Sequence, residues 1–181
     1  MKKLILSLSL IAGLFFSAIA QQDPKYKVSV GAEFLYPLNG VSEFYSAGYG
    51  ASLQGEYRLL PNLKATVSGG YISLEVNKLY KDIFNPWGVG LKSSNIFYPV
   101  KAGAKYYFNK SIYAAGELGA TISKDQNARA NSFAYAGGLG ATFAVSPKSS
   151  LDLGVKYEAW ALSASNTYSF VGLRAAYAFG F

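Results

Sequence analysis

The feature that most constrains this fold is an alternation of period two that recurs along most of the chain. From residue 26 onward, apolar side chains alternate with polar or small ones in eight segments, at residues 26–36, 48–60, 63–72, 96–108, 112–122, 133–145, 151–161 and 171–181. Successive side chains of a β-strand point to opposite faces of its sheet, so each segment is predicted to be a strand with one apolar and one polar face. The sequence therefore predicts an all-β protein.

Composition agrees with this fold class and narrows the chemistry that the protein can perform. A chain with 51% hydrophobic and 15% charged residues is not disordered, and 19 Gly with 16% aromatic residues suits strands and tight turns. There is no Cys and no His. These absences exclude disulfides and thiolate nucleophiles, and they remove the usual general base and the commonest metal ligand.

Charged residues are confined to one face of the predicted strands. The apolar face of the eight segments carries none of them. The opposite face carries five acidic and seven basic side chains, namely Lys27, Glu33, Glu56, Arg58, Lys64, Lys101, Lys105, Glu117, Asp152, Lys156, Glu158 and Arg174. Eight strands enclose room only for side chains or one small ligand, which suits the charged face with its many small residues. We therefore expect the apolar face to point outward; the alternative is a soluble, lipocalin-like barrel with its apolar face inside.

The connections between segments also favour a barrel in a membrane. Three are short, at residues 61–62, 109–111 and 146–149, and they alternate with four longer ones near residues 37–47, 73–95, 123–132 and 162–170. This arrangement is expected of an up-and-down barrel of the outer membrane. Hydrocarbon offers no hydrogen-bond partner to a strand edge, so such a sheet must close. The prediction is an eight-stranded antiparallel up-and-down transmembrane β-barrel.

Aromatic side chains on the apolar face are predicted to form two belts that flank an aliphatic band. Rings suit the level of the lipid headgroups, where an apolar body and a polar edge are both accommodated. The belt near the short turns comprises Tyr26, Tyr57, Tyr106, Phe108, Phe143, Phe179 and Phe181. The belt near the long loops comprises Phe34, Tyr36, Tyr49, Tyr71, Tyr98, Phe133 and Tyr135.

The first twenty residues have the layout of a secretory signal peptide. Lys2 and Lys3 precede an apolar stretch that ends in Ala18-Ile19-Ala20. We expect cleavage after residue 20, which leaves a barrel domain at residues 21–181; the alternative is an uncleaved membrane anchor. Export, together with basic residues that neither cluster nor form a stripe, makes nucleic acid an unsuitable partner.

The end of the chain resembles the signal by which outer membrane barrels are recognised during assembly. Arg174, Phe179 and Phe181 match that signal, whereas Ala176 stands where Gly is usual. With the leader and the eight segments, the whole mature chain resembles the small OmpX/OmpA-type outer membrane proteins of the Gram-negative cell envelope. The resemblance implies insertion by the barrel-assembly machinery, outer membrane lipid as surroundings and no cofactor.

The charged face predicts an ion-paired network inside the barrel. An unpaired charge in a narrow, partly dry interior is costly, so the acids and bases should pair and plug it. The residues predicted for this network are Glu33, Glu56, Arg58, Lys101, Lys105, Glu117, Lys156, Glu158 and Arg174. Two alternatives remain open, a narrow ion path and a carboxylate-based active site for lipid modification that would use Glu56 or Glu117.

The loop at residues 73–95 is the most distinctive of the long connections. Its candidate contact residues interleave rings with ammonium groups and are Lys78, Tyr80, Lys81, Phe84, Trp87 and Lys92. This mixture suits a surface protein ligand or anionic lipopolysaccharide; alternatively, the strands extend beyond the membrane and pack their own rings. The sequence thus predicts a non-enzymatic structural or surface-interaction role, with a narrow ion or small-solute pore as the alternative.

Overall fold

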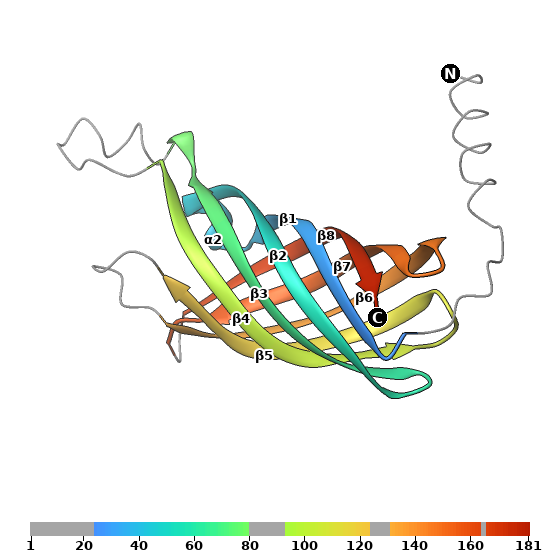
Figure 1. The fold of residues 1–181 in the computed structure, drawn as a ribbon. Helices are drawn as coiled ribbons and strands as arrows, with labels where there is room; N and C mark the ends of the chain where they lie inside the picture. The colour runs from blue at the N-terminus through green and yellow to red at the C-terminus, as the bar shows by residue number, and fades with distance from the viewer. Residues whose placement is uncertain (1–23, 80–92, 124–130, 164–165) are drawn as a thin grey trace, which may run out of the picture.

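The computed structural model describes residues 24–79, 93–123, 131–163 and 166–181 and shows a closed antiparallel barrel (Figure 1). Each strand pairs with its neighbours in sequence, and the last strand returns to pair with the first. The strands are β1 (Tyr26–Leu38), β2 (Tyr45–Leu60), β3 (Leu63–Val76), β4 (Ser94–Tyr107), β5 (Ile112–Ser123), β6 (Ser132–Ser146), β7 (Ser149–Ala161) and β8 (Thr167–Gly180). The predicted eight-stranded up-and-down barrel is confirmed.

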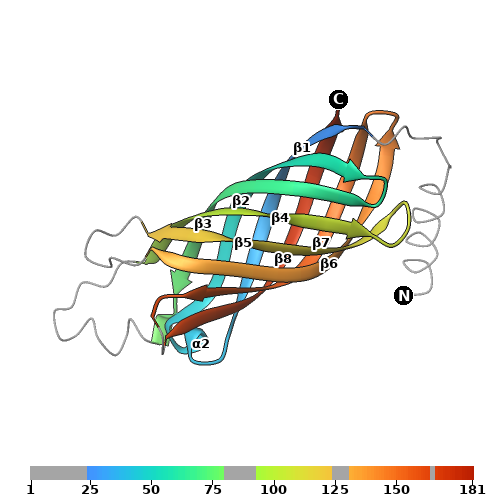
Figure 2. The same ribbon diagram turned by 90° about the horizontal axis from the view of Figure 1, so that it is seen from below.

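One short helix, α2 (Val41–Phe44), lies in the connection between β1 and β2. Within the described residues, no helix has the length and apolar character to cross a bilayer. The three short turns, the start of β1 and the end of β8 lie at one end of the barrel, and α2 lies at the other (Figure 2). We call these the short-turn end and the long-loop end. The predicted signal peptide, residues 1–20, lies outside the described residues.

Side-chain direction follows the predicted alternation. In β2, Leu53 is 55% exposed, whereas its neighbours Ser52 and Gln54 are 8% and 5% exposed. The members of both predicted aromatic belts lie on the outer face, where rings of adjacent strands meet, such as Tyr26 with Tyr57 at 5.3 Å between centroids. All twelve charges that the alternation predicts on the inner face are buried or half-buried. The apolar exterior of the barrel is therefore the surface that meets lipid.

Several strands run further toward the long-loop end than the alternation predicted. Leu38 of β1 still pairs with Ser169 of β8, and Tyr45 of β2 pairs with Val76 of β3. As a result, the connections predicted near residues 37–47 and 162–170 shorten to residues 39–44 and 162–166. The physical reason is that inward side chains at these strand ends become apolar, so the contrast between the two faces fades while the backbone pairing continues.

Candidate functional site

The interior of the barrel, its lumen, holds a continuous series of ion pairs that we call the charge chain. It runs in the order Glu117, Lys101, Glu158, Lys156, Glu33, Arg174, Asp152, Lys105 and Glu56. Neighbouring members always carry opposite charges. The shortest contact is 2.7 Å, between Lys105 Nζ and Glu56 Oε1, and the longest is 3.7 Å, between Arg174 Nε and Glu33 Oε1.

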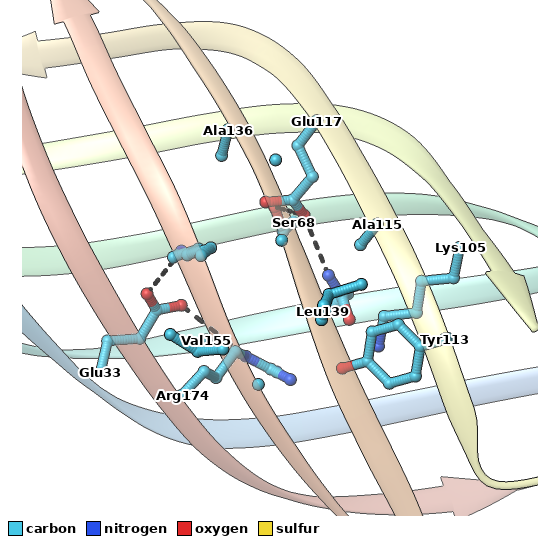
Figure 3. A pocket seen from close by; sticks show the side chains of 15 residues that line it. Glu33, Ser68, Lys105, Tyr113, Ala115, Glu117, Ala136, Leu139, Val155 and Arg174 are labelled. Atoms are coloured by element: carbon cyan, nitrogen blue, oxygen red, sulfur yellow. Dashed lines mark hydrogen bonds and ion pairs between the residues drawn. The ribbon is translucent and has the colours of Figure 1, made fainter.

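Four of these eight ion pairs tie together strands that are not hydrogen-bonded neighbours. Lys101 of β4 reaches Glu158 of β7 at 3.0 Å, and Lys156 of β7 reaches Glu33 of β1 at 2.8 Å. Only one of the eight links, between Glu33 and Arg174, joins residues paired in the sheet register. Figure 3 shows members of the chain projecting inward from different strands. The charge chain therefore crosses the lumen instead of lining one wall.

Neutral polar side chains complete the coordination of several carboxylates. Gln54 Nε2 and Ser68 Oγ donate to Glu117 Oε1 at 3.0 and 3.2 Å, and Trp160 Nε1 donates to Glu158 Oε1 at 2.9 Å. Tyr113 donates its hydroxyl proton to Asp152 Oδ1 at 2.8 Å. Buried charges are tolerated when they are both paired and hydrogen-bonded, and most members of the charge chain meet that condition.

The structure brings together eight of the nine residues that the sequence predicted for the network. Arg58, the ninth, lies two positions beyond Glu56 toward the short-turn end of β2 and is not a member of the charge chain. Asp152 is a member, although the alternation predicted only that it lies on the inner face. Its carboxylate contacts both Lys105 and Arg174, at 3.1 and 3.5 Å. Asp152 therefore links the Lys105–Glu56 pair to the rest of the charge chain.

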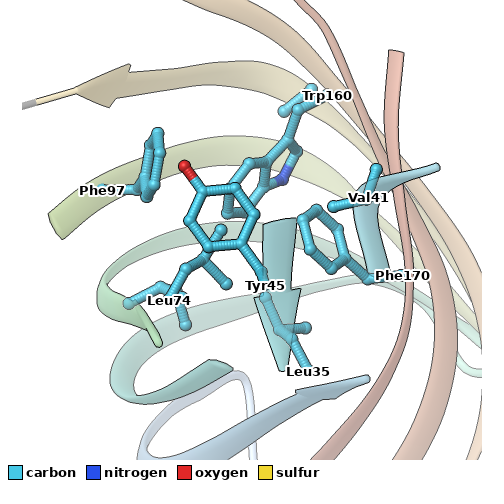
Figure 4. Packing of buried hydrophobic residues seen from close by; sticks show 9 residues of the cluster. Leu35, Val41, Tyr45, Leu74, Phe97, Trp160 and Phe170 are labelled. Atoms are coloured by element: carbon cyan, nitrogen blue, oxygen red, sulfur yellow. The ribbon is translucent and has the colours of Figure 1, made fainter. Parts of the chain in front are cut away.

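At the long-loop end the lumen is filled by an apolar cluster, which we call the apolar plug (Figure 4). Its ring centroids lie close together, at 5.1 Å for Phe97 and Trp160 and 4.7 Å for Trp160 and Phe170. Trp160 is only 1% exposed. The members are Leu35, Val41, Tyr45, Ile72, Leu74, Phe97, Ala134, Trp160 and Phe170. Val41 belongs to α2, so the short helix packs against the plug and caps this end of the lumen.

The apolar plug corrects the expectation of a polar interior along the whole barrel. That expectation holds for the middle and the short-turn end but not for the long-loop end. The sequence contained a usable signal, because Leu35, Ile72, Phe97, Trp160 and Phe170 all fall on the inward phase of their strands near the long loops. Their clustering depends on the strands closing into one ring, which the alternation alone did not reveal.

A small cavity remains beside the charge chain, lined in part by Gln54, Tyr113, Glu117 and Arg174 (Figure 3). Its volume of ≈ 50 Å³ has room for about three water molecules. Gln54 Oε1 and Glu56 Oε2 are buried and receive no hydrogen bond from the described part of the protein. Buried acceptors of this kind are commonly satisfied by internal water. The cavity is too small for a solute much larger than a few water molecules.

The residues that resemble an assembly signal do not form one surface. Phe179 and Phe181 face outward at the end of the chain, whereas Arg174 points into the lumen and joins the charge chain. Ala176, in the place where Gly is usual, is buried opposite Gly31 of β1. A Cβ on Gly31 would lie 2.6 Å from the Cβ of Ala176, so the close approach of β1 and β8 at this point depends on the glycine.

Most of the predicted loop contacts lie outside the described residues, whereas both carboxylates of the catalytic alternative are described. Lys78 is exposed just after β3; the other predicted loop contacts, Tyr80, Lys81, Phe84, Trp87 and Lys92, lie outside the described residues. Glu56 and Glu117, the carboxylates of the catalytic alternative, are ion-paired with Lys105 and Lys101 inside the lumen. Across the described ranges, no three carboxylates gather to hold a metal ion.

A closed barrel with an apolar exterior and an ion-paired interior defines the class of small transmembrane β-barrels of the outer membrane. Residues 6–180 match the family described as outer membrane protein beta-barrel domain, and the chain belongs to that family. The protein is therefore located in the outer membrane. A comparison with curated proteins found no match.

Solved structures of small outer membrane proteins share this fold. The attachment invasion locus protein Ail of Yersinia pestis, solved in complex with the heparin analogue sucrose octasulfate, has 19% identity and a TM-score of 0.55, over 87% of this chain and 100% of Ail. Neisserial surface protein A has 18% identity and a TM-score of 0.57, over 87% of this chain and 97% of that one. OprG from Pseudomonas aeruginosa has 13% identity and a TM-score of 0.57, over 89% and 97%. At these identities the likeness shows the fold alone.

Proposed function

We propose that the protein is a non-conducting outer membrane barrel whose loops at the long-loop end contact other molecules at the cell surface. The observation that supports this proposal is that two different barriers fill the lumen. The apolar plug fills the long-loop end, and the charge chain crosses the lumen below it. An ion that enters would have to displace packed rings and then break ion pairs whose partners are buried, which costs several kcal/mol per unpaired charge.

Conductance of the purified barrel in planar bilayers tests the closed lumen against the competing pore function. The wild-type protein is expected to insert without stable channel openings, while a known open porin conducts under the same conditions. The double variant Lys101→Ala with Trp160→Ala weakens both barriers and should raise the frequency of transient openings. Stable openings of the wild-type barrel would instead favour a narrow ion or small-solute pore.

For the surface contact we propose an anionic partner that meets the lysines of the loop after β3. Lys78 is the described member of this group, and Lys81 and Lys92 follow it in sequence. Ammonium groups form strong charge-assisted hydrogen bonds with phosphate and sulfate oxygens. The complex of Ail with a heparin analogue suggests two probes for this chain, heparin and lipopolysaccharide.

Binding of these two probes to vesicle-embedded barrel measures the proposed contact. The triple variant Lys78→Gln, Lys81→Gln and Lys92→Gln should bind both probes more weakly than wild type. Glu43→Gln is the control, because it removes an exposed acidic group from the same end and should not weaken binding. Equal binding by all three proteins would contradict an anionic partner. Capture from intact cells with and without residues 77–92 then tests the alternative of a protein partner.

We also propose that the outward rings of Phe179 and Phe181 contact the barrel-assembly machinery. Deleting Phe181 should slow assembly in cells, measured by pulse-chase conversion to the folded form, while refolding in detergent proceeds at the wild-type rate. The reason is that the Phe181 side chain is highly exposed, so it adds little to packing inside the barrel. Phe181→Ala, which keeps the backbone hydrogen bonds between Phe181 and Tyr26, controls for their loss in the deletion. A similar delay in both settings would assign Phe181 to folding instead of recognition.

A further inference from the structure

Exposed charged side chains are divided unequally between the two ends of the barrel. In the part of the chain that the structure describes, the long-loop end exposes Glu43, Glu75 and Lys78. At the short-turn end, the exposed charged side chains among the described residues are all lysines, Lys25, Lys110 and Lys148, which we call the lysine rim. Acidic and basic groups thus mix at one end, whereas the other presents a single sign of charge.

The backbone of each rim lysine is fixed by hydrogen bonds near it. The Lys25 carbonyl accepts from Arg58 N at 3.0 Å, and the Lys148 carbonyl accepts from Gly180 N at 2.7 Å. Next to Lys110, the Asn109 side chain accepts from the backbone N–H groups of the two residues that follow the lysine, both at 2.8 Å. The rim is therefore built on ordered turns.

The three lysines are distributed around the circumference. Lys25 precedes β1, Lys110 lies between β4 and β5, and Lys148 lies between β6 and β7 (Figure 2). Such a spacing cannot converge on one small ligand. It suits an extended, flat anionic partner that surrounds the barrel.

The height of the rim matches the headgroup level of the membrane. The outward rings nearest this end, such as Tyr26, Tyr57 and Phe108, belong to the aromatic belt that marks the lipid–water interface. Lys25 Nζ lies 5.9 Å and 5.7 Å from the centroids of the Tyr26 and Tyr57 rings. Because both rings face outward, the Lys25 ammonium lies on the lipid side of the wall.

Acidic groups described near this end do not offset the rim. Among the described residues, Glu56 and Asp152 have the carboxylate side chains closest to the short turns, and both are buried and ion-paired with Lys105. Among the side chains that the structure describes, the exposed charges at the short-turn end are therefore all positive.

We propose that the lysine rim binds the anionic headgroups of phospholipids in the periplasmic leaflet. Both chain ends and the short turns of outer membrane barrels lie on the periplasmic side, so the rim meets that leaflet. Each ammonium donates hydrogen bonds to phosphate oxygens at the level of the aromatic belt. The rim thereby selects anionic over zwitterionic lipid next to the barrel and fixes its depth in the membrane.

The test compares lipid selectivity in membranes of equal parts phosphatidylcholine and phosphatidylglycerol. Spin-labelled versions of the two lipids report their relative association constants at the barrel surface. The triple variant Lys25→Gln, Lys110→Gln and Lys148→Gln is compared with wild type and with the control Glu43→Gln, which changes an exposed charge at the long-loop end. All four side chains are exposed, so folding is retained, which circular dichroism verifies.

Wild type and the Glu43→Gln control are expected to favour phosphatidylglycerol, and the triple variant should lose this preference. The loss should be up to about fivefold for each lysine removed, and high salt should abolish the preference in wild type. Equal selectivity of wild type and the triple variant would overturn the proposal. If the triple variant keeps its lipid selectivity but no longer binds soluble peptidoglycan fragments, the proposal is also wrong, and the rim would instead bind a periplasmic polymer.

Discussion

Tyr113 fits inside the barrel because a residue on the neighbouring strand has no side chain. Its ring lies against Gly140 of β6, where an added Cβ would overlap the ring atoms. The hydroxyl then reaches Asp152, and the ring lies under the Lys105 ammonium at 4.6 Å from its centroid. One glycine thus allows an aromatic ring to support two members of the charge chain.

Replacing Gly140 by Ala should displace Tyr113 and lower the free energy of unfolding by about 1–3 kcal/mol, the usual cost of overpacking. Urea unfolding in vesicles, followed by tryptophan fluorescence, measures this change. Gly137→Ala on the same strand is the control, because the space around its added Cβ is open. Equal stability of the two variants would mean that Tyr113 is not held against Gly140.

Replacing Lys105 by Met should be more damaging, because it leaves Glu56 and Asp152 buried near each other without their shared cation. Removing one partner of a buried ion pair costs about 3–5 kcal/mol. The exposed Lys110→Met variant controls for loss of a positive charge, and its stability should stay within about 0.5 kcal/mol of wild type. A small effect at Lys105 would indicate that water enters the lumen and solvates both carboxylates.

Each strand of the barrel faces two environments, lipid outside and the lumen inside, because successive side chains point to opposite faces of the sheet. In β2 the outward Leu53 meets lipid while Gln54 and Glu56 meet the charge chain. At the long-loop end the inward side chains are apolar too, because β7 and β8 direct Trp160 and Phe170 into the lumen. The rings of β4, β7 and β8 then pack on one another, with α2 across them, and form the apolar plug.

Leu53→Arg tests the outward orientation of β2. An arginine on the lipid face near the membrane midplane should destabilise the barrel folded in vesicles by about 2–4 kcal/mol. Tyr57→Arg, nearer the headgroup level, is expected to cost about 0–1 kcal/mol by the same depth dependence. Equal penalties at the two positions would contradict the placement of Leu53 in the hydrocarbon core.

The whole molecule reverses the usual arrangement of a soluble protein. Aliphatic and aromatic side chains cover the outside, while a core of ion pairs and packed rings fills the inside. A closed sheet satisfies every strand edge internally, which a lipid environment demands. The two ends differ as well, since the lysine rim presents one sign of charge and the long-loop end presents both.

This surface predicts that residues 21–181 will not remain folded and monomeric in buffer without detergent or lipid. Transfer of purified, folded barrel to detergent-free buffer should cause aggregation, measured by light scattering, because exposed apolar patches of this extent drive association. Addition of detergent above its critical concentration before dilution is the control. A folded monomer in plain buffer would contradict the outward orientation of the apolar face.

The sequence by itself determined the number of strands, their antiparallel order and the face that each turns to lipid. A period of two assigns alternate residues to opposite faces without any knowledge of other strands, so Leu53 and Glu56 were correctly oriented. Tertiary structure decided which charges meet, since Lys101 and Glu158 come from strands that touch only across the lumen. It also decided that Phe97, Trp160 and Phe170 form a plug, because that contact requires the closed ring to bring three distant strands together.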